Sequence, residues 1–314
     1  MAEIKVVDRR RFTPAGARPV PPKPGDLPSV SHKTIDRPLM KASRYFKEHL
    51  RRNEGALKPE LFWITARGLL ISGEQTYAAI CALVADRRPK TLPLQASILV
   101  RSLLEALGNL LALSEDPQKR SFLFGCDGYR SAFEEYERLK AGFGSVAKWK
   151  DWLAQSEQLL KVHAMLLGLT PPQANNPAKH LPKRWPTPGG LLDKKRPMLS
   201  GTKLTAFKQL YDFWYATLSG YTHQRLRALS AALVTDDPSL QWSPGRIESN
   251  VVSEATLFLL CILSEIEVLA GFQPNVDLRV AWERVRPLDD MSEAMVKVRY
   301  GKLLGCHRTP KPGH

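Results

Sequence analysis

The stretch that most constrains the fold is Leu94–Leu113, which is rich in leucine and carries all its polar residues on one arc. At about 100° per residue in a helix, these residues occupy less than half of the circumference. They are Gln95, Ser97, Arg101, Ser102, Glu105 and Asn109. Because the remaining surface is apolar, we expect a central helix whose polar arc either faces solvent or lines a cleft. Arg101 and Glu105 lie one turn apart on this arc and can pair.

Apolar residues recur at three- and four-residue steps along most of the rest of the chain. This period predicts further helices at 39–54, 60–87, within 117–168, at 203–219 and at 246–271. No stretch shows the period of two that is typical of strands. The sequence therefore predicts a mostly α protein, an irregular multi-helix bundle. Its expected parts are a basic proline-rich tail at 1–38, a helical domain at 39–275, and short peripheral helices with a C-terminal tail at 276–314.

The net charge of +15 lies in two regions. Residues 1–52 hold 13 Lys/Arg and 5 Asp/Glu, and residues 176–208 hold 8 Lys/Arg and a single acid. We expect the N-terminal arm to be disordered or docked along a surface, because its prolines block helix hydrogen bonds. A surplus confined to a tail and a loop fits a polyanion partner such as RNA, DNA or an anionic surface. A solubilising charge cluster fits equally well.

Residues 169–202 interrupt the helical pattern with a long, basic, proline-rich insertion. Structureless loops of this length are uncommon in compact domains unless they are functional or mobile. An aromatic residue among cations is a composition that single-stranded nucleic acid favours, although a simple surface lid would have it too. The candidate anion-binding residues here are Lys183, Arg184, Trp185, Lys194, Lys195 and Arg196.

A second candidate site lies in Gln209–Leu233, where an aromatic-rich helix meets a polar turn. Gly220 favours a helix stop, and Thr222 can cap a new helix that starts at His223. Backbone N–H groups at a helix N-terminus favour an anion and keep a histidine neutral, so that it can act as a base. Arg225 and Arg227 follow within the next turn and could bind a phosphate. Alternatively, His223 only pins the turn by a hydrogen bond to the central helix.

Several classes of site and location are not indicated. The N-terminal residues are charged and proline-rich rather than apolar, and no window offers about 20 uninterrupted apolar residues, so we expect neither a signal peptide nor a membrane span. The four cysteines are scattered singly and show no zinc-site spacing. We therefore expect a cytoplasmic protein with reduced thiols and no metal or cofactor.

Two short motifs resemble the hallmarks of a group of uncharacterised bacterial helical proteins. Arg101-Ser-Leu-Leu-Glu105 matches R-x-x-x-E, and Ser219-Gly-Tyr-Thr-His223 matches S-x-Y-x-H about a hundred residues later. The group is distantly similar to HEPN-like and abortive-infection proteins. The resemblance implies a polar cluster of Arg101, Glu105, Ser219, Tyr221 and His223, and it also implies a homodimer.

Two functional hypotheses follow. In the first, the protein acts on or binds RNA or a nucleotide, as a stress or phage-defence effector. His223 would be the base or phosphate ligand, Arg101 and Arg225 would neutralise charge, Glu105 would orient His223, and Tyr221 would donate a hydrogen bond. In the second, the protein is a non-catalytic scaffold whose cluster fixes helix packing and whose basic segments bind a polyanion or an acidic protein. The sequence leaves open whether the protein is an enzyme.

Overall fold

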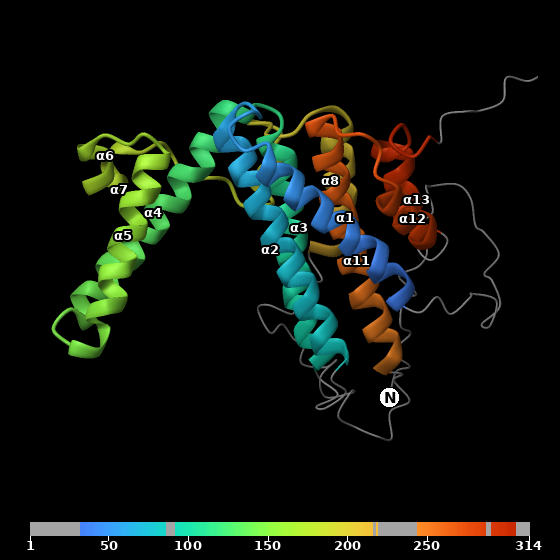
Figure 1. The fold of residues 1–314 in the computed structure, drawn as a ribbon, viewed down its shortest axis with the longest axis horizontal. Coiled ribbons are helices and arrows are strands. Elements are labelled where there is room, and N and C mark those ends of the chain that lie inside the picture. The colour runs from blue at the N-terminus through green and yellow to red at the C-terminus, as the bar shows by residue number, and fades with distance from the viewer. Residues whose placement is uncertain (1–31, 86–91, 216–217, 219–243, 287–289, 306–314) are drawn as a thin grey trace, which may run out of the picture. The chain divides into compact units, whose positions relative to one another are not determined.

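The computed structural model describes residues 32–85, 92–215, 218, 244–286 and 290–305. All regular secondary structure in these residues is helical, which confirms the multi-helix bundle (Figure 1). The chain divides into two compact units. The first comprises Met1–Arg52, Gly68–Leu110 and Ser200–His314, and the second comprises Asn53–Arg67 and Leu111–Leu199. The expected N-terminal arm lies almost wholly outside the described residues.

Long helices build the first unit, and short ones complete it. They are α1 (His32–Arg52), α2 (Glu60–Ala85), α3 (Leu92–Leu113), α8 (Gly201–Leu210), α11 (Pro244–Ala270), α12 (Val276–Val285) and α13 (Asp290–Met295), with α2 and α3 continuing into the second unit. Two π-helical turns, Tyr211–Tyr215 and Val296–Tyr300, directly follow α8 and α13. Turns of this type are rare and are often found at functional sites.

The core of the first unit forms where α2, α3 and α11 approach one another. Leucines of α3 and most residues of α11 from Ala255 to Ile266 are buried. The backbone of Gly73 in α2 lies so close to Leu103 and Ile262 that a Cβ there would already be in van der Waals contact with both side chains. The leucine-rich stretch that the sequence placed at the centre is therefore central in this unit.

Helix α1 begins at His32 rather than at Leu39, where the sequence suggested its start. Pro38 lies inside it and removes one backbone donor. One side of the helix nevertheless stays buried across the proline, through Ile35, Leu39 and Ala42. Burial of this apolar stripe outweighs the lost hydrogen bond, which is why the helix continues N-terminally beyond the proline.

The C-terminal helices contribute to the core of the first unit, although the sequence suggested a peripheral position. Trp282 of α12 is fully buried and donates a hydrogen bond from Nε1 to Ser264 Oγ at 2.9 Å. Tyr300 packs against it with ring centroids 5.5 Å apart. Gly271 ends α11 with φ of +61°, a left-handed conformation that favours glycine. This turn allows the chain to return along α11.

An α-hairpin forms most of the second unit. It consists of α4 (Pro117–Phe143) and α5 (Lys150–Leu166), followed by the short helices α6 (Pro171–Asn175) and α7 (Pro177–His180). Asp116 caps α4 by accepting a hydrogen bond from the backbone N–H of Lys119, and Pro117 occupies the first turn, where a missing backbone donor is tolerated. The buried side chains of this core are Cys126, Tyr129, Tyr136, Leu153, Leu160 and Leu181.

Two of the long helices are apolar and long enough to cross a membrane by composition alone. Among the described residues these are Glu60–Ala85 and Gln95–Leu113, and 22% and 67% of their most apolar 18-residue windows are buried. A buried core helix of a soluble protein passes the same test, so the two helices are weak evidence for a membrane span. The expected absence of a membrane span stays a prediction.

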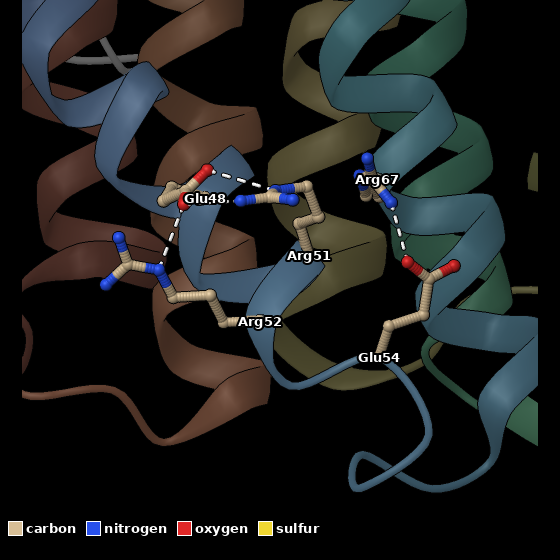
Figure 2. A network of polar contacts seen from close by, with 5 residues as sticks. All are labelled: Glu48, Arg51, Arg52, Glu54 and Arg67. Atoms are coloured by element: carbon tan, nitrogen blue, oxygen red, sulfur yellow. Dashed lines mark hydrogen bonds and ion pairs between the residues drawn. The ribbon is translucent and has the colours of Figure 1, made fainter.

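Ion pairs mark the end of α1 and the start of α2 (Figure 2). In the first unit, Glu48 accepts hydrogen bonds from Arg51 at 2.8 Å and from Arg52 at 2.9 Å. In the second unit, Arg67 donates to Glu54 at 2.8 Å. Arginines in the last turn of α1 also interact favourably with the helix dipole. These contacts stabilise the helix end locally.

Candidate functional site

The expected pair of Arg101 and Glu105 forms on α3, and a tyrosine extends it. Arg101 donates from Nε to Glu105 Oε1 at 2.8 Å and from Nη2 to the hydroxyl of Tyr215 at 2.9 Å. Its side chain is 21% exposed, and that of Glu105 is 32% exposed. The polar arc of α3 is thus partly covered by the π-helical turn, yet the pair still reaches solvent.

The aromatic rings of the π-helical turn form a stack beside Arg101. The guanidinium carbon lies 4.9 Å from the centroid of the Tyr215 ring, and the Tyr211 ring stacks on Tyr215 at 4.4 Å. The five-residue π turn places Tyr211 and Tyr215 one turn apart on the same side of the chain. The guanidinium is thus held by the Tyr215 ring and by its hydrogen bonds to Glu105 and to the Tyr215 hydroxyl.

Burial and pairing shift the pKa values of this cluster. Burial alone would lower the pKa of Arg101, but the hydrogen bond and charge of Glu105 outweigh it and raise this pKa. Burial raises the pKa of Tyr215, although the nearby Arg101 partly opposes the rise. Arg101 is therefore a permanent cation, and Tyr215 stays a neutral hydroxyl at physiological pH.

The polar turn that would complete this site lies outside the described residues. Tyr221, His223, Arg225 and Arg227 all belong to it. The proposed meeting of His223 with Arg101 and Glu105 therefore stays a prediction. Tyr215 precedes this turn by only a few residues, and the Arg101–Tyr215 bond joins the helix before the turn to α3.

The predicted insertion is a structured segment that runs along α4. We call its residues 169–199 the basic strap. Tyr129 donates to the carbonyl oxygen of Ala174 at 3.0 Å, and Arg130, which is 5% exposed, donates to the carbonyl oxygen of Pro182. Arg120 donates to the carbonyl oxygens of Ala112 and Met198. The side chains of α4 thus fix both the start and the end of the basic strap.

Four of the candidate cations on the basic strap are exposed and form no ion pair with any residue that the structure describes. They are Lys183, Lys194, Lys195 and Arg196. Arg184 differs, because its Nη2 donates to both carboxylate oxygens of Glu134 at 2.8 Å. Glu134 also raises the pKa of Arg184 through this hydrogen bond. The strap therefore presents positive charge that its own described neighbours do not neutralise.

Trp185 is half-buried and does not stand free as a stacking platform. Its ring packs edge-on against Phe124 of α4, with centroids 5.2 Å apart and planes at 85°. This contact is another attachment of the basic strap to α4. The indole face is thus committed in part to packing, which reduces its capacity to stack on a nucleobase.

Three polar residues with long-range contacts carry no recognisable motif in the sequence, namely Tyr215, Arg120 and Arg130. Tyr215 stood in a run of aromatic residues that indicated only burial, and its hydroxyl contact joins residues 114 positions apart. Arg120 and Arg130 bind backbone carbonyls, which no side-chain motif marks. A charged residue on the apolar side of α4 was the one signal available for Arg130.

Within the described ranges, no group of three or more His, Cys, Asp or Glu side chains could hold a metal ion. An open pocket of about 570 Å³ lies in the second unit, between the first turns of α2 and α4. Glu60, Asp116 and Lys119 are among its lining residues, and none of the candidate residues above belongs to it. Asp116 there serves as the cap of α4.

Comparisons with known proteins place the chain in a family but assign no activity. No curated protein and no solved structure was found to match it. A family model described as a family of unknown function, DUF5677, matches residues 64–240, more than half of the chain. The matched range includes both short motifs, the π-helical turn after α8, and the basic strap. The chain therefore belongs to the family of unknown function DUF5677.

Proposed function

We propose that the protein binds RNA, and that the basic strap is the surface that contacts it. The observation that supports this proposal is the set of four exposed cations on a segment fixed to α4, namely Lys183, Lys194, Lys195 and Arg196. Because the strap is held by α4, its charges keep a fixed spacing and lose little entropy on binding. Cations of this kind neutralise phosphates and release counterions.

The mode of contact that fits the basic strap is electrostatic. Trp185 packs on Phe124, so base stacking contributes little. Lysine acts as a point charge toward phosphate and reads no base sequence. We therefore expect affinity that falls steeply with salt and depends weakly on RNA sequence.

A HEPN-like function extends this proposal. In this hypothesis the protein is a stress or phage-defence effector that carries out a reaction on RNA or a nucleotide. Arg101 supports it, since its guanidinium is a fixed cation that retains solvent exposure. Its Nη1 has no hydrogen-bond partner among the described residues and could bind a phosphate oxygen. In this reading His223 supplies the base and Tyr221 a further donor.

The alternative is a scaffold in which the cluster is structural. It is favoured by the engagement of Arg101 with Glu105, with the Tyr215 hydroxyl and with the Tyr215 ring. Each of these contacts stabilises packing without any ligand. In that case the basic strap would still bind a polyanion or an acidic protein, and no substrate would be consumed.

The binding proposal is tested with fluorescently labelled RNA and a variant that carries K183A, K194A, K195A and R196A. Removing four phosphate contacts should reduce the slope of log K against log salt by about 3 for single-stranded RNA. The matched control removes four exposed lysines elsewhere in the second unit: K119A, K140A, K148A and K150A. If the control variant reduced this slope equally, RNA affinity would depend only on total charge. The basic strap would then lose its proposed role.

The reaction is tested by incubating labelled RNA with the wild type, H223A and R101A. Cleavage that both substitutions abolish, with unchanged RNA affinity, would support the HEPN-like reading. Binding without cleavage in the wild type would support the scaffold. Cleavage unaffected by H223A would remove His223 from the mechanism.

A further inference from the structure

One of the exposed sides of α5 is apolar. Most large hydrophobic side chains that are exposed among the described residues lie within 143–166, and Leu159 and Trp152 are 59% and 41% exposed. The set comprises Phe143, Val146, Trp152, Leu159, Val162, Met165 and Leu166. A concentration of this kind marks an interaction surface rather than an ordinary solvent face.

The apolar side chains of α5 form a regular seam. Trp152, Leu159 and Leu166 are spaced seven residues apart, and Val162 follows Leu159 by three. At about 100° per residue, the first three lie within about 20° of one line along the helix. This heptad spacing is typical of a helix that packs against another helix. Leu153 and Leu160, which lie on a different side of α5, are buried in the core of the second unit.

The seam carries no charged residue between its ends. Glu157 and Lys161 pair with each other at 2.8 Å, and at about 100° per residue both lie on the side of α5 opposite Leu159. The nearest polar neighbours of the seam are Gln155, Ser156 and His163. A chain with a net charge of +15 resists self-association in general, so an uncharged face is where two copies can approach most closely.

We propose that α5 pairs antiparallel with α5 of a second copy of this chain. Outside 143–166, the large hydrophobic side chains exposed in the described part of the chain are Val268 and Val276, which are too few to form a matching seam. The seam itself is self-complementary, because Trp152 and Leu166 are equally distant from Leu159. A two-fold axis at Leu159 generates a closed dimer with the same surface on both copies.

The antiparallel orientation follows from side-chain size and from the helix dipoles. It places each indole of Trp152 opposite the smaller Leu166 of the other copy, and Gln155 opposite His163 of that copy. A parallel pairing would place Trp152 against Trp152 and align the two dipoles unfavourably. The 17 residues of α5 span about 25 Å. A single helix of this length buries less than the about 800 Å² per partner of a standard interface. We therefore expect a micromolar dissociation constant.

The pairing is tested by sedimentation equilibrium of the full chain at about 1 to 100 μM, a range that brackets micromolar affinity. Leu159→Glu places two carboxylates at the two-fold axis and should raise the dissociation constant at least about tenfold. Ala154→Glu adds the same charge to an exposed position on another side of α5 and should leave the constant unchanged. Circular dichroism confirms that both variants keep the helical content of the wild type.

A charge swap tests the orientation. Trp152→Lys and Leu166→Glu should each weaken the dimer, and the double variant should restore it, because each lysine then faces a glutamate of the other copy. In a parallel dimer the double variant would remain weak, since like charges would meet. A wild type that is monomeric throughout, or a dimer that Leu159→Glu leaves intact, would overturn the proposal.

Discussion

Arg101 joins two segments that are 114 residues apart, because its Nη2 donates to the hydroxyl of Tyr215 at 2.9 Å while its Nε binds Glu105. The contact fixes the π-helical turn on α3 directly before the segment that contains His223. Loss of this hydrogen bond should therefore loosen the π-helical turn from α3.

Tyr215→Phe should lower the free energy of unfolding by about 0.5–1.5 kcal/mol, because it removes the hydroxyl and keeps the ring contacts. Urea denaturation measures the change. Tyr211→Phe is the matched control, since the hydroxyl of Tyr211 has no hydrogen-bond partner among the described residues. We expect the control to change stability by less than about 0.5 kcal/mol. Equal effects of the two substitutions would show that the Arg101 contact contributes nothing.

The buried pair of Glu265 and Arg299 gives a second prediction. Glu265 is fully buried and accepts two hydrogen bonds of 2.8 Å from Arg299, which also donates to Thr202. Arg299→Met leaves a buried carboxylate without its main partner. It should lower the free energy of unfolding by about 3–5 kcal/mol. The double variant with Glu265→Leu should recover most of this loss. Thermal and urea denaturation report both values.

The more exposed pair of Arg286 and Glu293 is the control for that experiment. Arg286→Met removes a contact of the same type at 2.8 Å, with side chains that are 31% and 34% exposed. Pairs near the surface are worth about 0–1 kcal/mol, so the loss should be small. If Arg299→Met lowered the free energy of unfolding no more than Arg286→Met, the buried pair would not stabilise the π-helical turn Val296–Tyr300.

Attachment of the basic strap to α4 predicts its resistance to trypsin. Arg130→Met removes a charged donor to the Pro182 carbonyl and should destabilise the attachment by about 1.5–3 kcal/mol. Cleavage after Lys183 and Lys194 should then accelerate about tenfold to a hundredfold, because it follows the population of the opened strap.

Glu134→Gln is the control, because it weakens a different contact of the strap and leaves every lysine and arginine at which trypsin cuts in place. It breaks the exposed pair with Arg184, which is worth less than about 1 kcal/mol, so cleavage should accelerate by less than about fivefold. Rapid cleavage of the wild type within the strap would contradict the fixed attachment.

The sequence predicted those features that depend on local spacing. The helical class followed from apolar recurrence, and the bond between Arg101 and Glu105 followed from their spacing of four residues. Local sequence also marks the ends of α5 and α11, because Gly168 and Gly271 follow these helices and both adopt positive φ.

Features that depend on distant contacts were not accessible. The sequence of residues 169–202 has no apolar period, so it predicted a loop, whereas Tyr129 and Arg130 hold the segment through its carbonyl oxygens. Backbone carbonyls occur at every residue, and no pattern of residue types reveals which one a distant donor will use. The early start of α1 was missed for a similar reason. Pro38 suggested that no helix precedes it, whereas packing of the residues on both sides of the proline keeps the helix continuous.

The end of α1 predicts a strongly acidic carboxyl group. Hydrogen bonds from Arg51 and Arg52 lower the pKa of Glu48 from 4.5 to about 2 (Figure 2). Since the folded pKa lies below the unfolded one, the stabilisation is fully present above pH 4.5 and is lost as the pH falls toward about 2. Carboxyl NMR titration of the wild type should find this low value, and Arg51→Gln with Arg52→Gln should return it toward 4.5. Lys41→Gln, on the same helix but without contact to Glu48, should leave it unchanged. A wild-type value above about 4, which is typical of an unpaired glutamate, would show that the two arginines do not hold the carboxylate in solution.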